Sequence, residues 1–201
     1  KADFKNYPST LAEDMQLLQS AGVDYIWLPT EHEIYNDAYR YRVTETDVSQ
    51  VCEGQHRPGH FDGVLTVLMK LFCLLRPHRV FFGEKDYQQL LLVRGLVDAF
   101  FLEMEVIACP TVRTQQGLAL SSRNSRLTAE QCVSSSVLSS ILRSSVSSDA
   151  AASALQEKGF EVEYVADCWG RRLAAVVVNG VRLIDNIELE GEVCAHNNIK
   201  V

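Results

Sequence analysis

The segment FFGEKDYQQL at residues 81–90 joins an apolar strand to the start of a helix. Residues 80–82 are β-branched or aromatic, and residues 86–101 read as an apolar helix. A buried strand that leads into a helix is typical of a parallel sheet with crossover helices. Ligands bind such sheets where a strand ends and a helix begins, so this one segment predicts an α/β fold and the place of its site.

The flanking segments continue the alternation of helices and strands. A capping box opens a helix at Thr10, and Gly22 ends it, while Pro77 closes a buried helix. The order favours a parallel sheet covered by helices. We expect helices over residues 10–22, 62–76 and 86–101, and strands over residues 25–28, 41–43, 80–82 and 104–108.

The pattern changes after Pro110. A capping box at Thr128 opens a Ser-rich helix to about residue 146, and a second helix follows over 150–158. Asn179-Gly180 lies between two apolar strands, 173–178 and 181–185, and supplies the two positive-φ residues of a type I′ hairpin turn. A further strand is expected over 161–165. We therefore predict an α/β domain over residues 1–110 and a smaller α+β domain over residues 111–201.

Composition limits the classes of function. Hydrophobic residues make up 47% of the 201 residues and charged residues 22%, a mixture that can bury a core. The net charge of −7 argues against a nucleic-acid binder, whose surface would be basic. The longest apolar run is too short to span a membrane. Six scattered cysteines without a C-x-x-C pair predict free thiols in a reducing compartment, which favours the cytoplasm.

The turn within residues 81–90 has the chemistry of an anion site. Gly83 permits close approach of the backbone to a ligand, and Lys85 adds a positive charge beside the amides that open the helix. Asp86 is placed to cap that helix, and Gln89 lies in its first turn. An exposed turn with a solvated lysine fits this segment about equally well when it is taken alone.

Two other segments carry polar groups suited to anions. GLALSSRN at 117–124 offers two hydroxyls and a guanidinium, although an ST-rich connector is the slightly favoured reading from these residues alone. EGQHRPGHF at 53–61 places Arg57 and His60 in a polar loop before a buried helix. His56 and His60 could suggest a metal, but no carboxylate–His helix signature accompanies them, so anion binding is favoured.

Taken together and in this order, the segments resemble the pantoate–β-alanine ligase family. The resemblance rests on YP at 7–8, ED at 13–14, RPGHF at 57–61, FGEKDYQQL at 82–90, LSSRN at 120–124 and RLIDN at 182–186. It implies a Rossmann-like nucleotidyltransferase domain followed by a lid domain, and a homodimer. It also implies that ATP and pantoate form pantoyl adenylate and pyrophosphate, after which β-alanine displaces AMP.

The resemblance also implies residue roles. Lys85, Ser121, Ser122 and Arg123 would act in catalysis, Gln89 would bind pantoate, and Arg57 and His60 would line the same cleft. Asp14 would help to hold Mg²⁺. The positions expected to contact ATP are Gly83, Glu84, Lys85, Asp86, Val112, Leu120, Ser121, Ser122 and Arg123.

Some features depart from the family pattern. The phosphate motif His-x-Gly-His and the Pro-Met-Gln-Phe strand end, both expected before Lys1, are absent, so we expect an N-terminally incomplete sheet and no turnover by residues 1–201 alone. The link at 168–170 is shorter than usual. Two alternatives stay open: another nucleotidyltransferase of the superfamily, and a non-catalytic remnant that binds only a nucleotide or a partner. Pyrophosphate exchange that depends on the acid substrate, pantoate, distinguishes the ligase from the first alternative.

Overall fold

The computed structural model describes residues 11–189, and the chain divides into two compact units, Lys1–Arg40 and Tyr41–Val201. The first unit contains helix α2 (Leu11–Ser20) and the short helix α3 (Glu31–Ile34). Thr30 caps α3: its hydroxyl accepts from the Glu33 amide at 3.3 Å, and its own amide donates to the Glu33 carboxylate at 2.7 Å. The predicted helix at 10–22 is confirmed over α2, while its cap at Thr10 and the segment at 7–8 lie outside the described residues.

The two short strands predicted before residue 50 are wrong. Residues 25–28 form no strand, and the described part of the first unit offers them no second strand with which to build a ladder. Residues 41–43 of the second unit are also irregular, because the Val43 amide donates to the Thr66 hydroxyl at 2.9 Å and not to a neighbouring strand.

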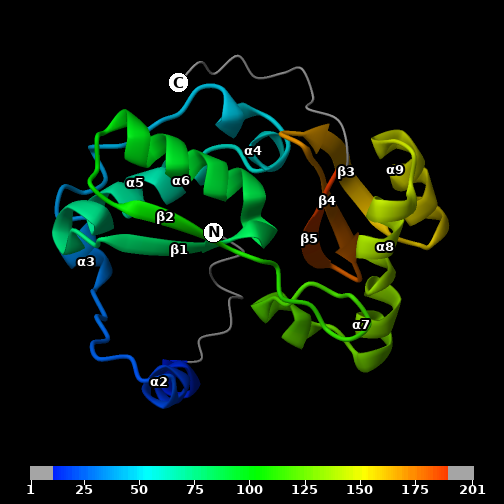
Figure 1. Cartoon of the computed structure of the whole chain (residues 1–201), viewed down its shortest axis with the longest axis horizontal. Helices are drawn as coiled ribbons and strands as arrows, with labels where there is room; N and C mark the ends of the chain where they lie inside the picture. Colours follow the sequence, from blue (N-terminus) through cyan, green and yellow to red (C-terminus); the bar gives the residue numbers. More distant parts are fainter. Residues whose placement is uncertain (1–10, 190–201) are drawn as a thin grey trace. The chain divides into compact units, whose positions relative to one another are not determined.

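The second unit begins with a parallel pair of strands. Strands β1 (Arg79–Gly83) and β2 (Glu105–Cys109) pair from Arg79↔Glu105 to Gly83↔Cys109. Helices α5 (His60–Leu75) and α6 (Tyr87–Ala99) lie together over this pair (Figure 1). The helix–strand–helix–strand order predicted for residues 62–108 is confirmed.

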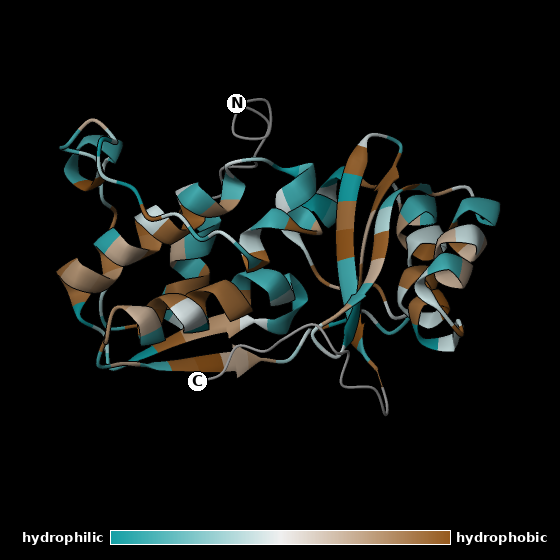
Figure 2. Ribbon diagram, turned by 90° about the horizontal axis from the view of Figure 1, so that it is seen from above, coloured by the Kyte–Doolittle hydropathy of each residue, from teal (hydrophilic) through white to brown (hydrophobic). Residues whose placement is uncertain are grey.

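Apolar side chains hold these helices to the strands. Val93 is fully buried and Leu65 is 2% exposed, in one cluster with Val80 and Phe82 of β1. Figure 2 shows hydrophobic stretches, in brown, on both the helices and the strands. Full burial of an aliphatic side chain contributes about 1.5–3 kcal/mol. This packing fixes the start of α6, and with it the turn that follows β1.

A three-stranded antiparallel sheet forms the other layer of the second unit. Its order is β3 (Glu161–Cys168), β4 (Arg171–Val178) and β5 (Val181–Glu188). Helices α8 (Val137–Ser144) and α9 (Ser148–Glu157) pack on it through a cluster that includes the buried Leu142, Leu155 and Val176.

Two-residue turns join the strands of this sheet. Asn179 and Gly180 have φ values of 47° and 76°, which confirms the predicted type I′ hairpin. Trp169 and Gly170, with φ values of 54° and 72°, turn the chain from β3 to β4 in the same way. The short link at 168–170 is therefore a second hairpin turn, which the sequence did not predict.

The Ser-rich helix is not continuous, which corrects the prediction. It divides into α7 (Ala129–Ser135), capped by Thr128 as predicted, and α8. The break lies at Ser136, whose hydroxyl donates to the Val133 carbonyl at 2.6 Å. Serine hydroxyls compete in this way with the backbone bonds of a helix.

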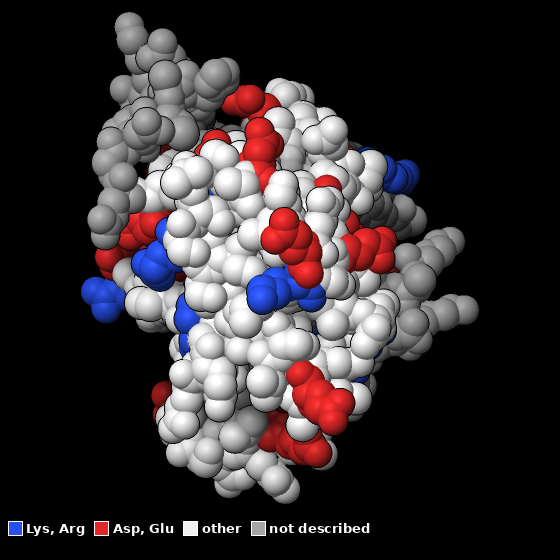
Figure 3. Space-filling view, turned by 90° about the vertical axis from the view of Figure 1, so that its right-hand side faces the viewer, with Lys and Arg blue, Asp and Glu red and all other residues white. Residues whose placement is uncertain are grey.

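The predicted fold class is confirmed: a parallel α/β layer is accompanied by an α+β part with its own antiparallel sheet. The compact division falls at residues 40 and 41, so both sheets lie in the second unit, and the boundary at 110/111 stays a prediction. Within residues 11–189 no helix has the length and apolar character needed to cross a bilayer. The face shown in Figure 3 carries acidic and basic side chains interspersed among uncharged ones.

Candidate active site

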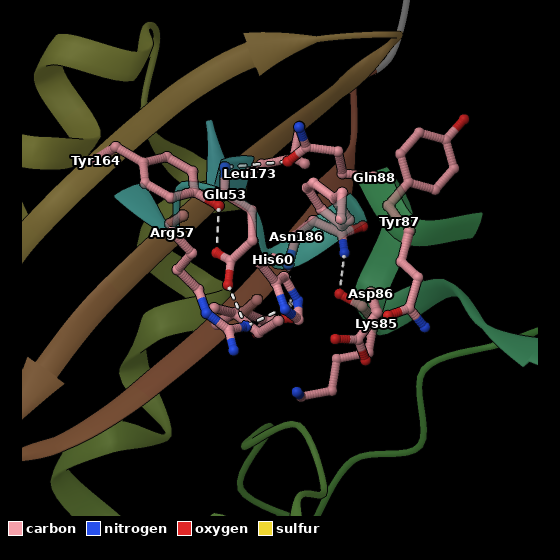
Figure 4. A pocket seen from close by; sticks show the side chains of 15 residues that line it. Glu53, Arg57, His60, Lys85, Asp86, Tyr87, Gln88, Tyr164, Leu173 and Asn186 are labelled. Carbon is pink, nitrogen blue, oxygen red and sulfur yellow. Dashed lines mark hydrogen bonds and ion pairs between the residues drawn. The ribbon is translucent and has the colours of Figure 1, made fainter. Parts of the chain in front are cut away.

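A polar pocket lies between the loop before α5, the turn after β1 and the antiparallel sheet (Figure 4). Lys85 is part of its wall and also lines a smaller adjoining pocket, to which Ser121 and Arg123 contribute. The first pocket is lined by Glu53, Arg57, His60, Phe61, Lys85, Asp86, Tyr87, Gln88, Gln89, Tyr164, Leu173, Ala174, Ile184, Asp185 and Asn186. Lys85 therefore stands where the two pockets meet.

The Lys85 turn is short because β1 ends at Gly83 and one turn of 3₁₀ helix, η2 (Glu84–Asp86), leads into α6. The Asn186 side chain on β5 donates to the backbone carbonyls of Glu84 and Lys85, each at 2.9 Å. The Glu84 carboxylate pairs with Arg171 at 3.1 Å. The turn that carries the lysine is thus fixed by the antiparallel sheet.

Gly83 is not required by the fold. Its φ is −71°, an angle that any residue adopts, and a Cβ built on it would meet open space. The space beside it is therefore available to a ligand.

The segment 111–124 is held against β5. The Arg113 guanidinium donates to both carboxylate oxygens of Asp185, at 2.6 and 2.8 Å, and Asp185 raises the pKa of Arg113. An isolated bridge pairs Arg113 with Ala119, and the Leu120 amide donates to the Val112 carbonyl at 2.9 Å. Val112 and Leu120 therefore lie next to each other.

The hydroxyl-rich turn follows directly. The Ser121 hydroxyl accepts from the Arg123 amide at 3.2 Å and caps the 3₁₀ helix η3 (Ser122–Arg126). Ser121 and Arg123 line the smaller pocket with Lys85, and Ser122 between them is part of the turn but not of the pocket wall.

A buried carboxylate, Glu53, organises the wall opposite Lys85. It accepts from Arg182 at 2.7 and 2.8 Å, from Arg57 at 3.1 Å and from the Tyr164 hydroxyl at 3.3 Å. Burial opposes ionisation of Glu53, but the hydrogen bonds and charges of Arg182 and Arg57 outweigh it and lower its pKa. Glu53 therefore links α4 (Glu53–His56) to β3 and β5.

His60 opens α5 within this wall. Its Nε2 lies 3.0 Å from Arg57 Nη1, and burial together with the Arg57 charge lowers the pKa of His60. Since Arg57 can only donate, His60 accepts at Nε2 and is neutral at pH 7.

The adjacent glutamines at the start of α6 have different environments. Gln88 is 3% exposed, and its amide binds the backbone of Val48, Val51 and Glu53 at 2.6–3.0 Å. Gln89 is partly exposed and lines the pocket. Gln88 thus holds the loop before α4, while Gln89 is available to a ligand.

The structure brings most of the predicted site residues together. Lys85, Asp86, Gln89, Arg57 and His60 line the first pocket, and Ser121 and Arg123 line the second. Gly83 and Glu84 adjoin Lys85 in the chain. Val112 and Leu120 are 64% and 51% exposed. Asp14 lies in the first turn of α2, in the first unit, and its link to magnesium stays a prediction.

The residues of the site without a predicted role include Glu53, Arg113, Asp185 and Asn186. Asp185 and Asn186 lie in the RLIDN segment, where two polar residues interrupt an apolar strand, and each is 3% exposed. Buried polar groups need partners, so this interruption was an available signal. Among the described residues, no three His, Cys, Asp or Glu side chains form a group able to hold a metal ion.

The fold is that of the nucleotidyltransferase class of α/β proteins, and the pocket lies where a parallel strand ends and a helix begins. A family model for pantoate-beta-alanine ligase matches residues 1–188. The chain belongs to the pantoate–β-alanine ligase family.

Individual relatives agree with this assignment. The chain is 50% identical to pantothenate synthetase of Legionella pneumophila (strain Corby) over 184 residues, which cover 92% of this chain and 73% of the relative. Identity is also 50% to pantothenate synthetase of Coxiella burnetii (strain Dugway 5J108-111) over 187 residues, 93% of this chain and 72% of the relative.

Solved structures are similar as well. The pantoate-beta-alanine ligase of Francisella tularensis, complexed with beta-gamma ATP and beta-alanine, superposes with a TM-score of 0.88 at 36% identity, covering 95% of this chain and 74% of that one. Pantothenate synthetase of Thermus thermophilus gives a TM-score of 0.85 at 39% identity, covering 92% of this chain and 77% of that one.

Proposed function

We propose that this protein condenses pantoate with β-alanine at the expense of ATP, through a pantoyl adenylate. One carboxylate oxygen of pantoate bonds to the α-phosphorus while the bond to the β-phosphate oxygen breaks, and pyrophosphate leaves. The amine of β-alanine then forms the amide bond, AMP leaves with the electron pair of the acyl–oxygen bond, and the amine gives up a proton.

The single observation that carries this proposal is the position of Lys85. Lys85 lines two pockets. Gln89, Arg57 and His60 also line the first, and Ser121 and Arg123 also line the second. A carboxylate in the first pocket and an α-phosphate in the second would meet at its ammonium group. Attack of one anion on another needs positioning and charge stabilisation more than acid–base chemistry, and Lys85 and Arg123 are suitable for that role.

In this assignment ATP lies along Gly83, Glu84, Lys85 and Asp86 and beneath Ser121, Ser122 and Arg123, with Val112 and Leu120 offering apolar contact. Pantoate lies at Gln89, within reach of Arg57 and His60. Segment 111–124 lines the second pocket at Leu118, Ala119, Ser121, Arg123 and Asn124. We propose that this segment is the hinge of a lid that begins at residue 111 and shields the adenylate from water.

Magnesium enters the proposal as the ion carried by the ATP phosphates, where it offsets their charge. Mg²⁺ commonly binds through substrate phosphates and one or two carboxylates, and Asp14 is the candidate carboxylate. We further propose that the protein acts as a homodimer in the cytoplasm.

The proposal is tested by measuring AMP and pyrophosphate formed by the purified full-length protein. AMP is expected only when ATP, pantoate and β-alanine are all present. Exchange of pyrophosphate into ATP is expected when pantoate is present and β-alanine is left out. Exchange that is independent of pantoate, or ADP in place of AMP, would reject the proposal.

The two adjacent glutamines give a matched comparison. Gln89→Ala is expected to raise the KM for pantoate by about tenfold, since a lost hydrogen bond costs on the order of 1.4 kcal/mol, while the KM for ATP changes little. Gln88→Ala is expected to lower the free energy of unfolding by about 1–3 kcal/mol, because it removes the side-chain partner of the buried Glu53 amide and of the Val48 carbonyl. Steady-state kinetics and urea unfolding separate the two; equal changes of both KM values for Gln89→Ala would contradict the assignment.

Gly83→Ala tests the ATP side. The fold accommodates the added methyl, so the midpoint of thermal unfolding is expected to stay within about 2 °C of the wild type. The methyl would occupy the space assigned to ATP, so the KM for ATP is expected to rise about tenfold or more. An unchanged KM for ATP would show that ATP does not approach this turn.

A further inference from the structure

We infer that the dipeptide Asp185-Asn186 on β5 is the positioning element of the active site, which sets the Lys85 turn and the Ser121–Arg123 turn relative to each other. The inference rests on the proposed function, because it concerns how the groups assigned to ATP are held. Neither residue is argued to touch a substrate.

The Asn186 amide has one orientation that satisfies its neighbours. Both of its N–H groups are used, one on the Glu84 carbonyl and one on the Lys85 carbonyl, each at 2.9 Å, and its Oδ1 accepts from Arg171 at 2.9 Å. The reversed amide would set its oxygen against two carbonyls and its NH₂ against a guanidinium, which can only donate. Because no N–H remains for a ligand, Asn186 acts on the backbone that carries Lys85.

Arg171 fixes the amide in this orientation. Its guanidinium also donates to the Glu84 carboxylate at 3.1 Å and lies 4.4 Å above the centre of the Tyr87 ring. The turn from Glu84 to Tyr87 is therefore held at two carbonyls, one carboxylate and one aromatic ring by Asn186 and its neighbour on β4.

Asp185 holds the other turn. Its two oxygens accept from Arg113, and its Oδ1 also accepts from the backbone amide of Asn186 at 2.8 Å. Arg113 in turn donates to the carbonyls of Gly117 and Asn186, at 3.1 and 3.2 Å. The loop that leads to Ser121 and Arg123 is thereby tied to the same two residues of β5.

Two anion-binding turns that are far apart in the sequence thus share one short, buried anchor. A displacement of about 1 Å of a reacting group can cost about 100-fold in rate. Loss of this anchor is therefore expected to lower the turnover number by more than the change in the free energy of unfolding explains.

The experiment uses the full-length protein with Asn186→Ala and Asn186→Asp. Asn186→Asp keeps the shape and the contact to Arg171 but turns an oxygen toward two carbonyls. Both variants are expected to lower kcat by about 10- to 100-fold, with a smaller change in the KM for ATP. Asp185→Asn, which leaves Arg113 without its charge partner, is expected to act mainly on the KM for ATP, because Ser121 and Arg123 follow that loop.

The matched control is Asp167→Asn. Asp167 pairs with Arg172 at 2.7 and 2.8 Å on the same sheet, and Arg172 otherwise binds the carbonyls of Leu142 and Ser145, at the end of α8. This variant breaks a comparable ion pair away from both turns. It is expected to lower the unfolding midpoint and leave kcat within about twofold of the wild type.

A double-mutant cycle separates positioning from general damage. If Asn186 acts through Lys85, Asn186→Ala added to Lys85→Ala gives no further loss of kcat, whereas independent effects multiply. Should Asn186→Ala fail to fold, Arg171→Gln, which frees the amide, takes its place in the cycle with an expected loss of about tenfold.

The outcomes distinguish this inference from the proposed function. A wild-type protein without pantoate-dependent AMP formation would overturn the proposed function. An active wild type, with Asn186→Ala no slower than Asp167→Asn or with multiplying effects in the cycle, would overturn the positioning role alone.

Discussion

Lys85→Ala is expected to lower kcat by about 10²–10³-fold while the free energy of unfolding stays within about 0.5 kcal/mol of the wild type. The reason is electrostatic: Lys85 would offset charge that builds on the α-phosphate oxygens, and no described side chain that lines both pockets carries another full positive charge. Pantoate-dependent AMP formation measures the loss.

Lys158→Ala serves as the control, since Lys158 lies exposed at the end of α9 and lines neither pocket. Its kcat is expected to match the wild type. A loss of less than tenfold for Lys85→Ala would contradict the role assigned to this residue.

Glu53→Gln is expected to lower the free energy of unfolding by about 1–3 kcal/mol. The change leaves the guanidinium of Arg182, whose side chain is 18% exposed, with Glu163 as its remaining charge partner, and weakens the contacts of Arg57 and Tyr164. Urea unfolding followed by circular dichroism measures it. The exposed pair of Arg79 and Glu105, with side chains 68% and 60% exposed, gives the control. Glu105→Gln is expected to cost about 0–1 kcal/mol, and equal losses for the two variants would show that Glu53 is not a structural centre.

The same carboxylate gives the fold a pH dependence with a definite sign. The pKa of Glu53 is lowered in the folded state, so its contribution to stability is complete above the pKa of the unfolded chain, near 4.5, and is lost as the pH falls through the folded value. The Glu53→Gln variant should therefore approach the stability of the wild type as the pH falls below about 4.5. A difference between the two that is unchanged from pH 7 to pH 3 would contradict this.

Much of the fold was available in the sequence because local signals agreed with the tertiary structure. The apolar period of residues 62–101 and the Asn179-Gly180 turn each specify their element without help from distant residues. The predictions that failed concern elements that local residues do not specify by themselves. Residues 25–28 have strand composition without a partner strand among the described residues, and the break at Ser136 depends on which hydroxyl takes a backbone carbonyl.

The site shows the same division. Lys85, Ser121 and Arg123 could be selected because their chemistry is visible in each segment. The groups that hold them could not, because Asn186 reaches Glu84 across 102 positions of the chain and Arg113 reaches Asp185 across 72. Such pairings are set where β5 meets the turn after β1 and the loop that carries Arg113. Buried polar residues in an apolar strand indicate that partners exist without identifying them.

The most direct test of the proposed chemistry follows an oxygen atom. Pantoate labelled with ¹⁸O in its carboxylate is incubated with the full-length protein, ATP and β-alanine, and the nucleotide and phosphate products are analysed by mass spectrometry. If the carboxylate attacks the α-phosphorus, one ¹⁸O passes into AMP for each pantothenate formed, and pyrophosphate stays unlabelled. Label in inorganic phosphate together with ADP, or unlabelled AMP, would contradict the adenylate and with it the placement of pantoate and the α-phosphate on either side of Lys85.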